Sequence, residues 1–118
     1  MALLYSREML IEPNALLLAL QSIFPDFGGE ELFEDIRAGE ASLHTIMIAF
    51  ASWFDAKAAK PSQLSGLAAL IGHCVSIPNH LENAVATCLL EHLHQIDKQG
   101  ILGKFLSLDV VTYLRRRN

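Results

Sequence analysis

Proline and glycine divide this sequence into short segments, and their spacing limits the secondary structure that the chain can form. The breaks fall at Pro13, Pro25, Gly28-Gly29, Gly39, Pro61, Pro78 and Gly100. Between them, apolar residues recur every three or four positions, which is the spacing of one face of an α-helix. Leucine and alanine supply 34 of the 118 residues, whereas valine, isoleucine and threonine, which favour strands, supply 16. The sequence therefore predicts an all-α protein of about six helices.

The expected helices cover residues 13–24, 30–38, 42–59, 62–77, 80–98 and 108–117, with a short turn or helix over 101–106. Ser42, Asn79 and Ser107 stand where N-cap residues are expected, and Glu82 gives Asn79 the spacing of a capping box. The segment 42–59 has the clearest buried stripe, made of Leu43, Ile46, Met47, Phe50, Ala51 and Phe54. In the last helix we expect Val111 and Leu114 to face inward. A further short turn is expected to begin at Ser6.

Short connections between these segments favour antiparallel packing of consecutive helices. Two architectures remain open: a HEAT-like stack of helical hairpins, which offers one broad face to a partner, and a compact helical bundle. At 118 residues and 13.0 kDa, the chain has the length of one domain, and we expect that domain to span 1–118.

The composition excludes two broad classes of protein. With 52% hydrophobic and 19% charged residues the chain is too apolar for intrinsic disorder. No apolar run approaches the roughly 18 residues of a membrane span, and the run at 15–20 is too short and badly flanked for a signal peptide.

Cys74 and Cys88 fall within apolar helical patterns, so we expect them to be buried and reduced. A cytoplasmic protein without membrane contact is the resulting prediction.

The formal net charge of −4 is unevenly distributed along the chain. Residues 1–55 hold nine acids and two bases, a net −7, whereas residues 56–118 hold four acids and seven bases, a net +3. An acidic half repels phosphate and attracts basic partners. Three arginines at positions 115–117 and a pI of about 5.6 do not make a nucleic-acid interface. The charge pattern thus predicts a basic protein partner.

The predicted partner-binding residues are Glu30, Glu31, Glu34, Asp35 and Trp53. The four acids belong to a short helix and are expected to form a solvated face, with no apolar shield that would suit them to acid–base chemistry. Trp53 lies one step off the buried stripe of its helix, so it either covers the edge of the core or anchors an interface. A homodimer that buries Trp53 is a further alternative.

A small metal- or thiol-dependent enzyme is the other alternative. Cys88 and His92 are four residues apart on one expected helix, with His73 and Cys74 on the preceding helix and His80 between the two. A zinc site needs four converging ligands, and no CxxC or HExxH pattern is present. Because Cys88 belongs to a buried stripe, a nucleophilic thiol is not favoured. We expect no catalytic residue, metal or cofactor.

Two segments resemble a known group of sequences. Phe24-Pro-Asp-Phe27 precedes an acidic short helix, and Leu81-Glu-Asn-Ala-Val-Ala-Thr-Cys-Leu-Leu-Glu-His-Leu93 follows an amphipathic middle. This pattern is similar to small all-helical bacterial families of unknown function that include immunity-protein-like members, although Leu89-Leu90 replaces an aromatic-leucine pair. The resemblance spans about residues 13–114. It implies a HEAT-like domain that binds protein and lacks catalytic residues, with neutralisation of a toxin as its role.

Overall fold

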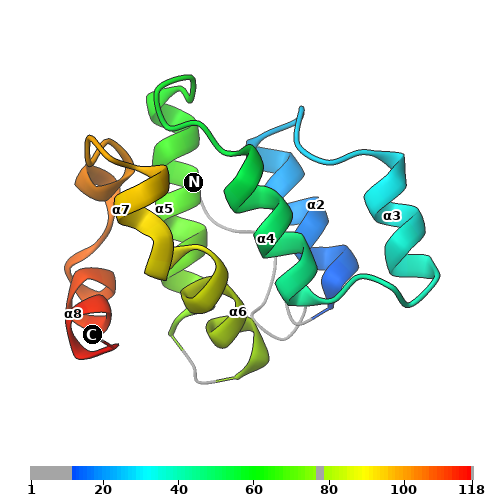
Figure 1. Cartoon of the computed structure of the whole chain (residues 1–118). Helices are drawn as coiled ribbons and strands as arrows, with labels where there is room; N and C mark the ends of the chain where they lie inside the picture. The colour runs from blue at the N-terminus through cyan, green and yellow to red at the C-terminus, as the bar shows by residue number, and fades with distance from the viewer. Residues whose placement is uncertain (1–11, 77–78, 118) are drawn as a thin grey trace.

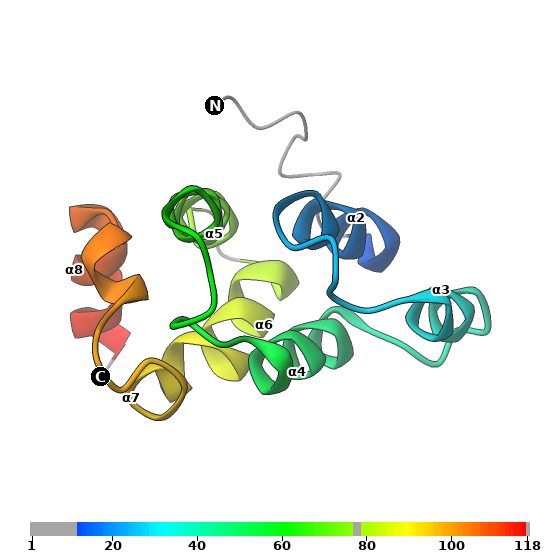
Figure 2. The same ribbon diagram turned by 90° about the horizontal axis from the view of Figure 1, so that it is seen from above.

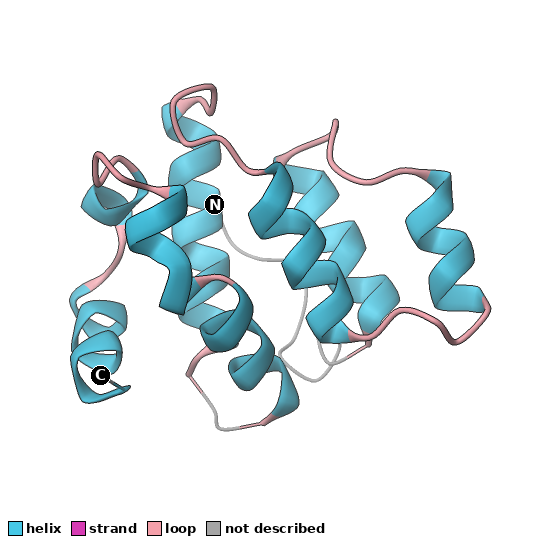
Figure 3. Ribbon diagram, viewed as in Figure 1, coloured by secondary structure: helices cyan, strands magenta, loops and turns pink. Residues whose placement is uncertain are grey.

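Helices supply all the regular structure of the computed structural model over the residues it describes, 12–76 and 79–117 (Figure 3). The turn expected at Ser6 lies outside those residues. The α-helices are α2 (Pro13–Ile23), α3 (Glu30–Arg37), α4 (Leu43–Trp53), α5 (Pro61–Cys74), α6 (His80–Cys88), α7 (Leu93–Ile96) and α8 (Leu108–Arg117), and the 3-10 helices are η1 (Leu90–His92) and η2 (Leu102–Phe105). The predicted all-α class is confirmed.

Four helices enclose the centre of the molecule. Helix α2 packs against α4 and α5, and α6 packs against the same two helices, so the four form a closed ring (Figure 1). Seen from above, α3 lies at one end of this arrangement and α8 at the other (Figure 2). The Cα radius of gyration is 13.3 Å, against roughly 13.5 Å for a globular domain of this length. Of the two predicted architectures, these features favour the compact bundle.

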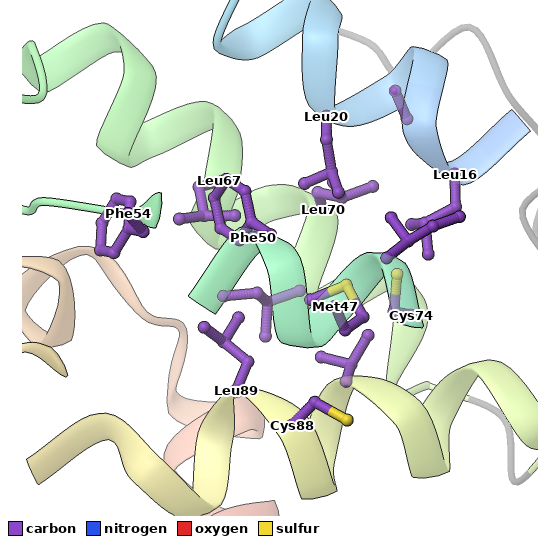
Figure 4. Close-up of a cluster of buried hydrophobic side chains, with 14 of the residues drawn as sticks. Leu16, Leu20, Met47, Phe50, Phe54, Leu67, Leu70, Cys74, Cys88 and Leu89 are labelled. Carbon is purple, nitrogen blue, oxygen red and sulfur yellow. The ribbon is translucent and has the colours of Figure 1, made fainter. Parts of the chain in front are cut away.

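The closed ring surrounds one cluster of buried apolar side chains. Each helix turns its apolar stripe toward the cluster, and Figure 4 shows how the side chains of α2, α4, α5 and α6 meet there. The fully buried members include Leu16, Leu17 and Leu20 from α2, Ile46 and Phe50 from α4, Leu67 and Ile71 from α5, and Leu81 and Leu89 on either side of α6. The longest described helix, α5, has 14 residues, and none of the described helices is long and apolar enough to cross a bilayer.

Three of the predicted N-caps are confirmed by hydrogen bonds. At α4, Ser42 Oγ accepts from the Thr45 backbone N–H at 3.3 Å and Thr45 Oγ1 accepts from the Ser42 N–H at 3.1 Å, which makes a reciprocal capping box. At α6, the Asn79 side chain accepts from the Glu82 N–H at 2.9 Å. At α8, Ser107 Oγ accepts from the Val110 N–H at 3.3 Å. Side chains therefore fix the start of each of these helices.

The helix expected over 42–59 is shorter than predicted. Helix α4 ends at Trp53, and Phe54 takes an extended conformation with φ −64° and ψ 132°. Asp55 Oδ1 then accepts a hydrogen bond from the Lys57 N–H at 3.0 Å. This local side-chain turn competes with the helix for the backbone, so the chain leaves the helix after Trp53.

The continuous helix expected over 80–98 is also wrong. Helix α6 ends at Cys88, and the chain continues through η1 and α7, with Leu89 at φ −119° and ψ −60° between them. Cys88, Leu89 and Leu90 are all buried, at 7%, 0% and 4% exposure. The segment in which the helix breaks therefore lies in the core.

In α8 the buried face differs from the predicted one by a residue. Val110 is buried at 1% exposure, whereas Val111 is half-buried. Leu114, predicted to face inward, is half-buried and packs against the core cluster together with Tyr113. The Tyr113 hydroxyl donates a hydrogen bond to the Glu82 carboxylate of α6. Helix α8 thus takes a register that the sequence pattern alone did not indicate.

Candidate functional site

Trp53 is an exposed aromatic residue held by other aromatic rings. The residue is 42% exposed, although its ring lies 5.7 Å from that of Phe24, 5.5 Å from that of Phe27 and 6.1 Å from that of Phe50, measured between centroids. The edge-on contact with Phe24 is a favourable arrangement for aromatic pairs. Trp53 is thus fixed on one side by the core and presented to solvent on the other.

A hollow of about 590 Å³ lies beside Trp53 and is called the Trp53 hollow below. Its walls come from three places: the segment after α2, the end of α4 with the turn that follows, and the start of α5. The lining residues are Phe24, Pro25, Asp26, Trp53, Asp55, Ala58, Ala59, Lys60 and Gln63. Its volume falls within the range of pockets that bind small ligands.

Gln63 fixes one wall of the Trp53 hollow. Its side-chain Nε2 donates to the Ile23 carbonyl oxygen at 3.1 Å, and its Oε1 accepts from the Lys60 backbone N–H at 2.8 Å. The amide therefore connects the end of α2 to the start of α5. A residue that satisfies both of its amide atoms in this way holds the two segments at a defined separation.

The acidic residues of α3 face solvent. Glu30, Glu31 and Glu34 are exposed and Asp35 is half-buried, whereas Leu32 and its apolar neighbours pack against the core cluster. Glu30 and Glu31 occupy the first turn of the helix, where the macrodipole favours negative charge. The helix has no buried residue, so its outer face is free of the constraints that core packing imposes.

The segment between α2 and α3 connects Trp53 with the acidic start of α3. Phe27 contacts the Trp53 ring, and Glu30 begins α3 three residues later. In Figure 1 the end of α4 and the start of α3 both lie toward the top of the view, with α3 set apart at the right. Gly28 has φ +70°, and a Cβ atom there would stand 3.1 Å from Leu32 Cδ1, so the turn both needs a left-handed conformation and allows a close approach. Glu34 and Asp35 lie further along the helix.

Two residues of this surface, Asp26 and Gln63, were not singled out by the sequence. They are 37 positions apart along the chain and line the same hollow because α2 packs against α5. No local pattern signals that proximity.

Cys88 and His92 line a different, more apolar hollow of about 380 Å³ together with Ile48, Ala51, Ser52, Thr87, Gln95 and Ile96. Burial, with a contribution from the nearby charge of Glu91, raises the pKa of the Cys88 thiol. A raised pKa leaves little thiolate, which is the nucleophilic form. Because η1 begins at Leu90, the two residues are also not on consecutive turns of one α-helix. The site does not favour a Cys–His nucleophile.

The remaining thiol and imidazoles do not assemble a metal site in the part of the chain that the structure describes. Cys74 is buried and free of a disulfide, as is Cys88, and burial raises the pKa of the Cys74 thiol to about 12. No group of three or more His, Cys, Asp or Glu side chains among the described residues could hold a metal ion. His73 and His80 therefore do not converge with Cys74 there.

Comparison with protein-family models, with curated proteins and with solved structures finds no match to this chain. The resemblance to immunity-protein-like families stays a prediction that rests on residues 13–114 alone.

Proposed function

We propose that this protein is a non-catalytic interaction module that binds a basic protein partner through its acidic N-terminal half and Trp53. The observation that carries the proposal is Trp53, which is 42% exposed yet packed against three phenylalanine rings, and one of these, Phe27, lies three residues before the start of α3 at Glu30. Large exposed aromatic residues of this kind dominate the energetics of protein interfaces.

The rigidity of Trp53 supports this function. A side chain that is already ordered loses less conformational entropy on binding, so more of its contact energy appears as affinity. The three ring contacts order the indole before any partner arrives. A surface tryptophan on a mobile loop would not have this advantage.

The exposed acids supply a complementary contribution. Negative charge on one lobe steers a basic partner toward it and raises the association rate, an effect that salt weakens. The particular form we propose is a bacterial immunity-like protein that neutralises a basic toxin in the cytoplasm. Its two free cysteines suit a reducing compartment, and the sequence resemblance supports the immunity role.

The test uses a triple variant, Glu30→Lys, Glu31→Lys and Glu34→Lys, which leaves the half-buried Asp35 unchanged. Wild type and variant are immobilised, the proteins captured from a lysate of the source organism are identified, and the association rate of each purified candidate is then measured. A true partner should be basic, and its association with the variant should be about tenfold slower. Raising salt from about 50 mM to about 500 mM should slow association with wild type.

A matched control reverses three acids elsewhere, with Glu12→Lys, Glu91→Lys and Asp109→Lys. It changes the net charge equally but leaves α3 intact, so its association rate should fall much less. Trp53→Ala, checked for folding by circular dichroism, should accelerate dissociation of the same partner by about tenfold or more. Equal association rates for the two triple variants would place the interface elsewhere.

A further inference from the structure

We infer that the Trp53 hollow receives an arginine side chain of the partner, an inference that rests on the proposed function. The hollow combines aromatic walls with two carboxylates, and this combination is complementary to a guanidinium group. Trp53 provides the exposed aromatic ring, backed by the buried ring of Phe24, and Asp26 and Asp55 provide acceptors. A cation over an indole face is attracted by the ring quadrupole, and tryptophan is the strongest partner for this contact.

The carboxylate of Asp55 is held in position by the chain. Its Oδ1 accepts the Lys57 N–H at 3.0 Å, which fixes the orientation of the side chain. Within the described residues its other oxygen, Oδ2, has no hydrogen-bonding partner. An acceptor that is oriented before binding and still available costs little to engage.

The balance of charge in the hollow favours a cation. Asp26 and Asp55 give two negative charges, and Lys60 gives the single positive charge among the lining residues that the structure describes. All three side chains belong to exposed residues. An anionic ligand would meet both carboxylates, whereas a cation meets only Lys60, so the net field of the lining attracts positive charge.

Arginine fits these walls better than lysine. Its guanidinium is planar, stacks on aromatic faces and donates from five N–H groups, so one side chain can contact the indole and a carboxylate together. A lysine ammonium is a strongly hydrated point charge that cannot stack. We therefore expect the basic partner to place an arginine, not a lysine, in the Trp53 hollow.

The test exploits the fact that Trp53 is the only tryptophan of the chain. Its fluorescence is followed while the full protein is titrated with a flexible Gly/Ser peptide that carries three arginines. The same peptide with each arginine replaced by citrulline, which keeps the shape but removes the charge, serves as the neutral probe, and a three-lysine peptide tests the preference for a planar cation. We expect a saturable change with the arginine peptide and about tenfold weaker binding of the citrulline peptide.

The variant for this test is Asp26→Asn with Asp55→Asn, and its control is Glu12→Gln with Asp109→Asn. Both variants remove two exposed negative charges. In the control, however, Glu12 lies just before the start of α2, whereas Phe24 follows its end, and Asp109 lies on α8. The first variant should bind the arginine peptide about fivefold more weakly than wild type, and the affinity of the control should change less than about twofold. Thermal melts establish that both variants are folded.

Several outcomes overturn the inference. These are equal binding of the arginine and citrulline peptides, lysine binding as tight as arginine binding, no fluorescence change at millimolar peptide, or equal effects of the two double variants. If any occurs while the triple α3 variant still slows the natural partner, the proposed function stands without this contact. If neither set of variants affects that partner, both proposals fail.

Sedimentation of the protein alone tests whether a second copy of this chain fills the hollow. A dimer that is abolished by Arg115→Ala, Arg116→Ala and Arg117→Ala would make the occupant a second copy and overturn the assignment to a partner.

Discussion

Helices α3 and α4 follow one another in the chain but serve opposite purposes. Helix α4 begins with a reciprocal capping box at Ser42 and buries four of its own residues. Helix α3 begins after Gly29 with no side-chain cap, buries none, and carries two acids in its first turn. Stability and surface charge are therefore separated between the two helices. Helix α4 contributes to the core, whereas α3 packs on the outside of the core and displays charge.

Trp53 stands at the boundary between these two roles. It is the last residue of α4, packs against Phe50 of the core, and contacts Phe27 in the segment that leads to α3. A substitution in α4 should therefore lower the stability of the fold more than it alters partner binding, and a substitution in α3 should do the reverse. The following measurements test that separation, beginning with the largest expected effect.

Replacement of Phe50 by alanine should destabilise the protein by about 3–5 kcal/mol, because the side chain is fully buried and its removal leaves a cavity. Phe33→Ala in α3 removes the same group from a half-buried position and should cost about 1–2 kcal/mol. Urea unfolding followed by circular dichroism measures both. Similar losses for the two variants would show that α3 contributes to the core as much as α4 does.

The buried thiol of Cys74 predicts a loss of stability at alkaline pH. Cys74 shares a small internal cavity of about 10 Å³ with Met47 of α4, and burial raises its pKa from 9.0 to about 12. The unfolded thiol thus loses its proton first, so the free energy of unfolding falls as pH rises from about 9 toward about 12. By pH 10 this should cost on the order of 1 kcal/mol.

The measurement compares wild type with Cys74→Ala by urea unfolding between pH 8 and pH 10. The alanine variant starts less stable, because it lacks the buried sulfur, but its stability should fall less steeply over this interval. Parallel slopes for the two proteins would mean that Cys74 is not the group responsible.

The two N-caps should differ in their sensitivity to substitution. Ser42→Ala removes the hydroxyl that accepts from the Thr45 N–H and contacts Thr45 Oγ1, and it should cost about 1 kcal/mol. Gly29 precedes α3 in an extended conformation, and the space that a Cβ atom would occupy there is open, so Gly29→Ser should change stability by at most about 0.5 kcal/mol. Thermal denaturation resolves a difference of this size. A larger effect at Gly29 would reveal a packing role for the start of α3.

The smallest effect on stability is expected at the exposed acids. Glu34→Gln should alter the free energy of unfolding by less than about 0.5 kcal/mol, since surface substitutions away from special contacts are nearly neutral. The same variant should slow association with a basic partner, because it removes one of the charges that steer it. Denaturation and binding kinetics on one preparation compare the two effects directly, and a stability loss above about 1 kcal/mol would contradict the separation.

Much of the fold could be predicted because local signals determine it. Pro13 and Pro61 begin helices where expected, and Ser42, Asn79 and Ser107 act as predicted caps. These features depend on residues within one turn of each other, so the sequence displays them directly. The predicted helices over 42–59 and 80–98 were too long: the first ends before the side-chain turn at Asp55, and the second breaks at Leu89 within the buried core.

The candidate site was predictable only in part. Trp53 lies off the buried stripe of its helix, and its exposure follows from that position; the acids of α3 likewise lie on the face opposite its apolar residues. The meeting of Asp26, Asp55 and Gln63 in one hollow depends on how α2 packs against α5. Such packing is set by the shapes of many side chains together and leaves no mark at any single position.

The sequence by itself determined the helical class, the position of most helix starts and the division of charge between the two halves, because these follow from residue type and spacing. Only the tertiary structure decided that α2, α4, α6 and α5 close into a ring, that the buried thiols carry raised pKa values, and that a tryptophan and two carboxylates share one hollow. Burial and proximity between distant segments arise when a whole core packs, and local sequence does not encode them.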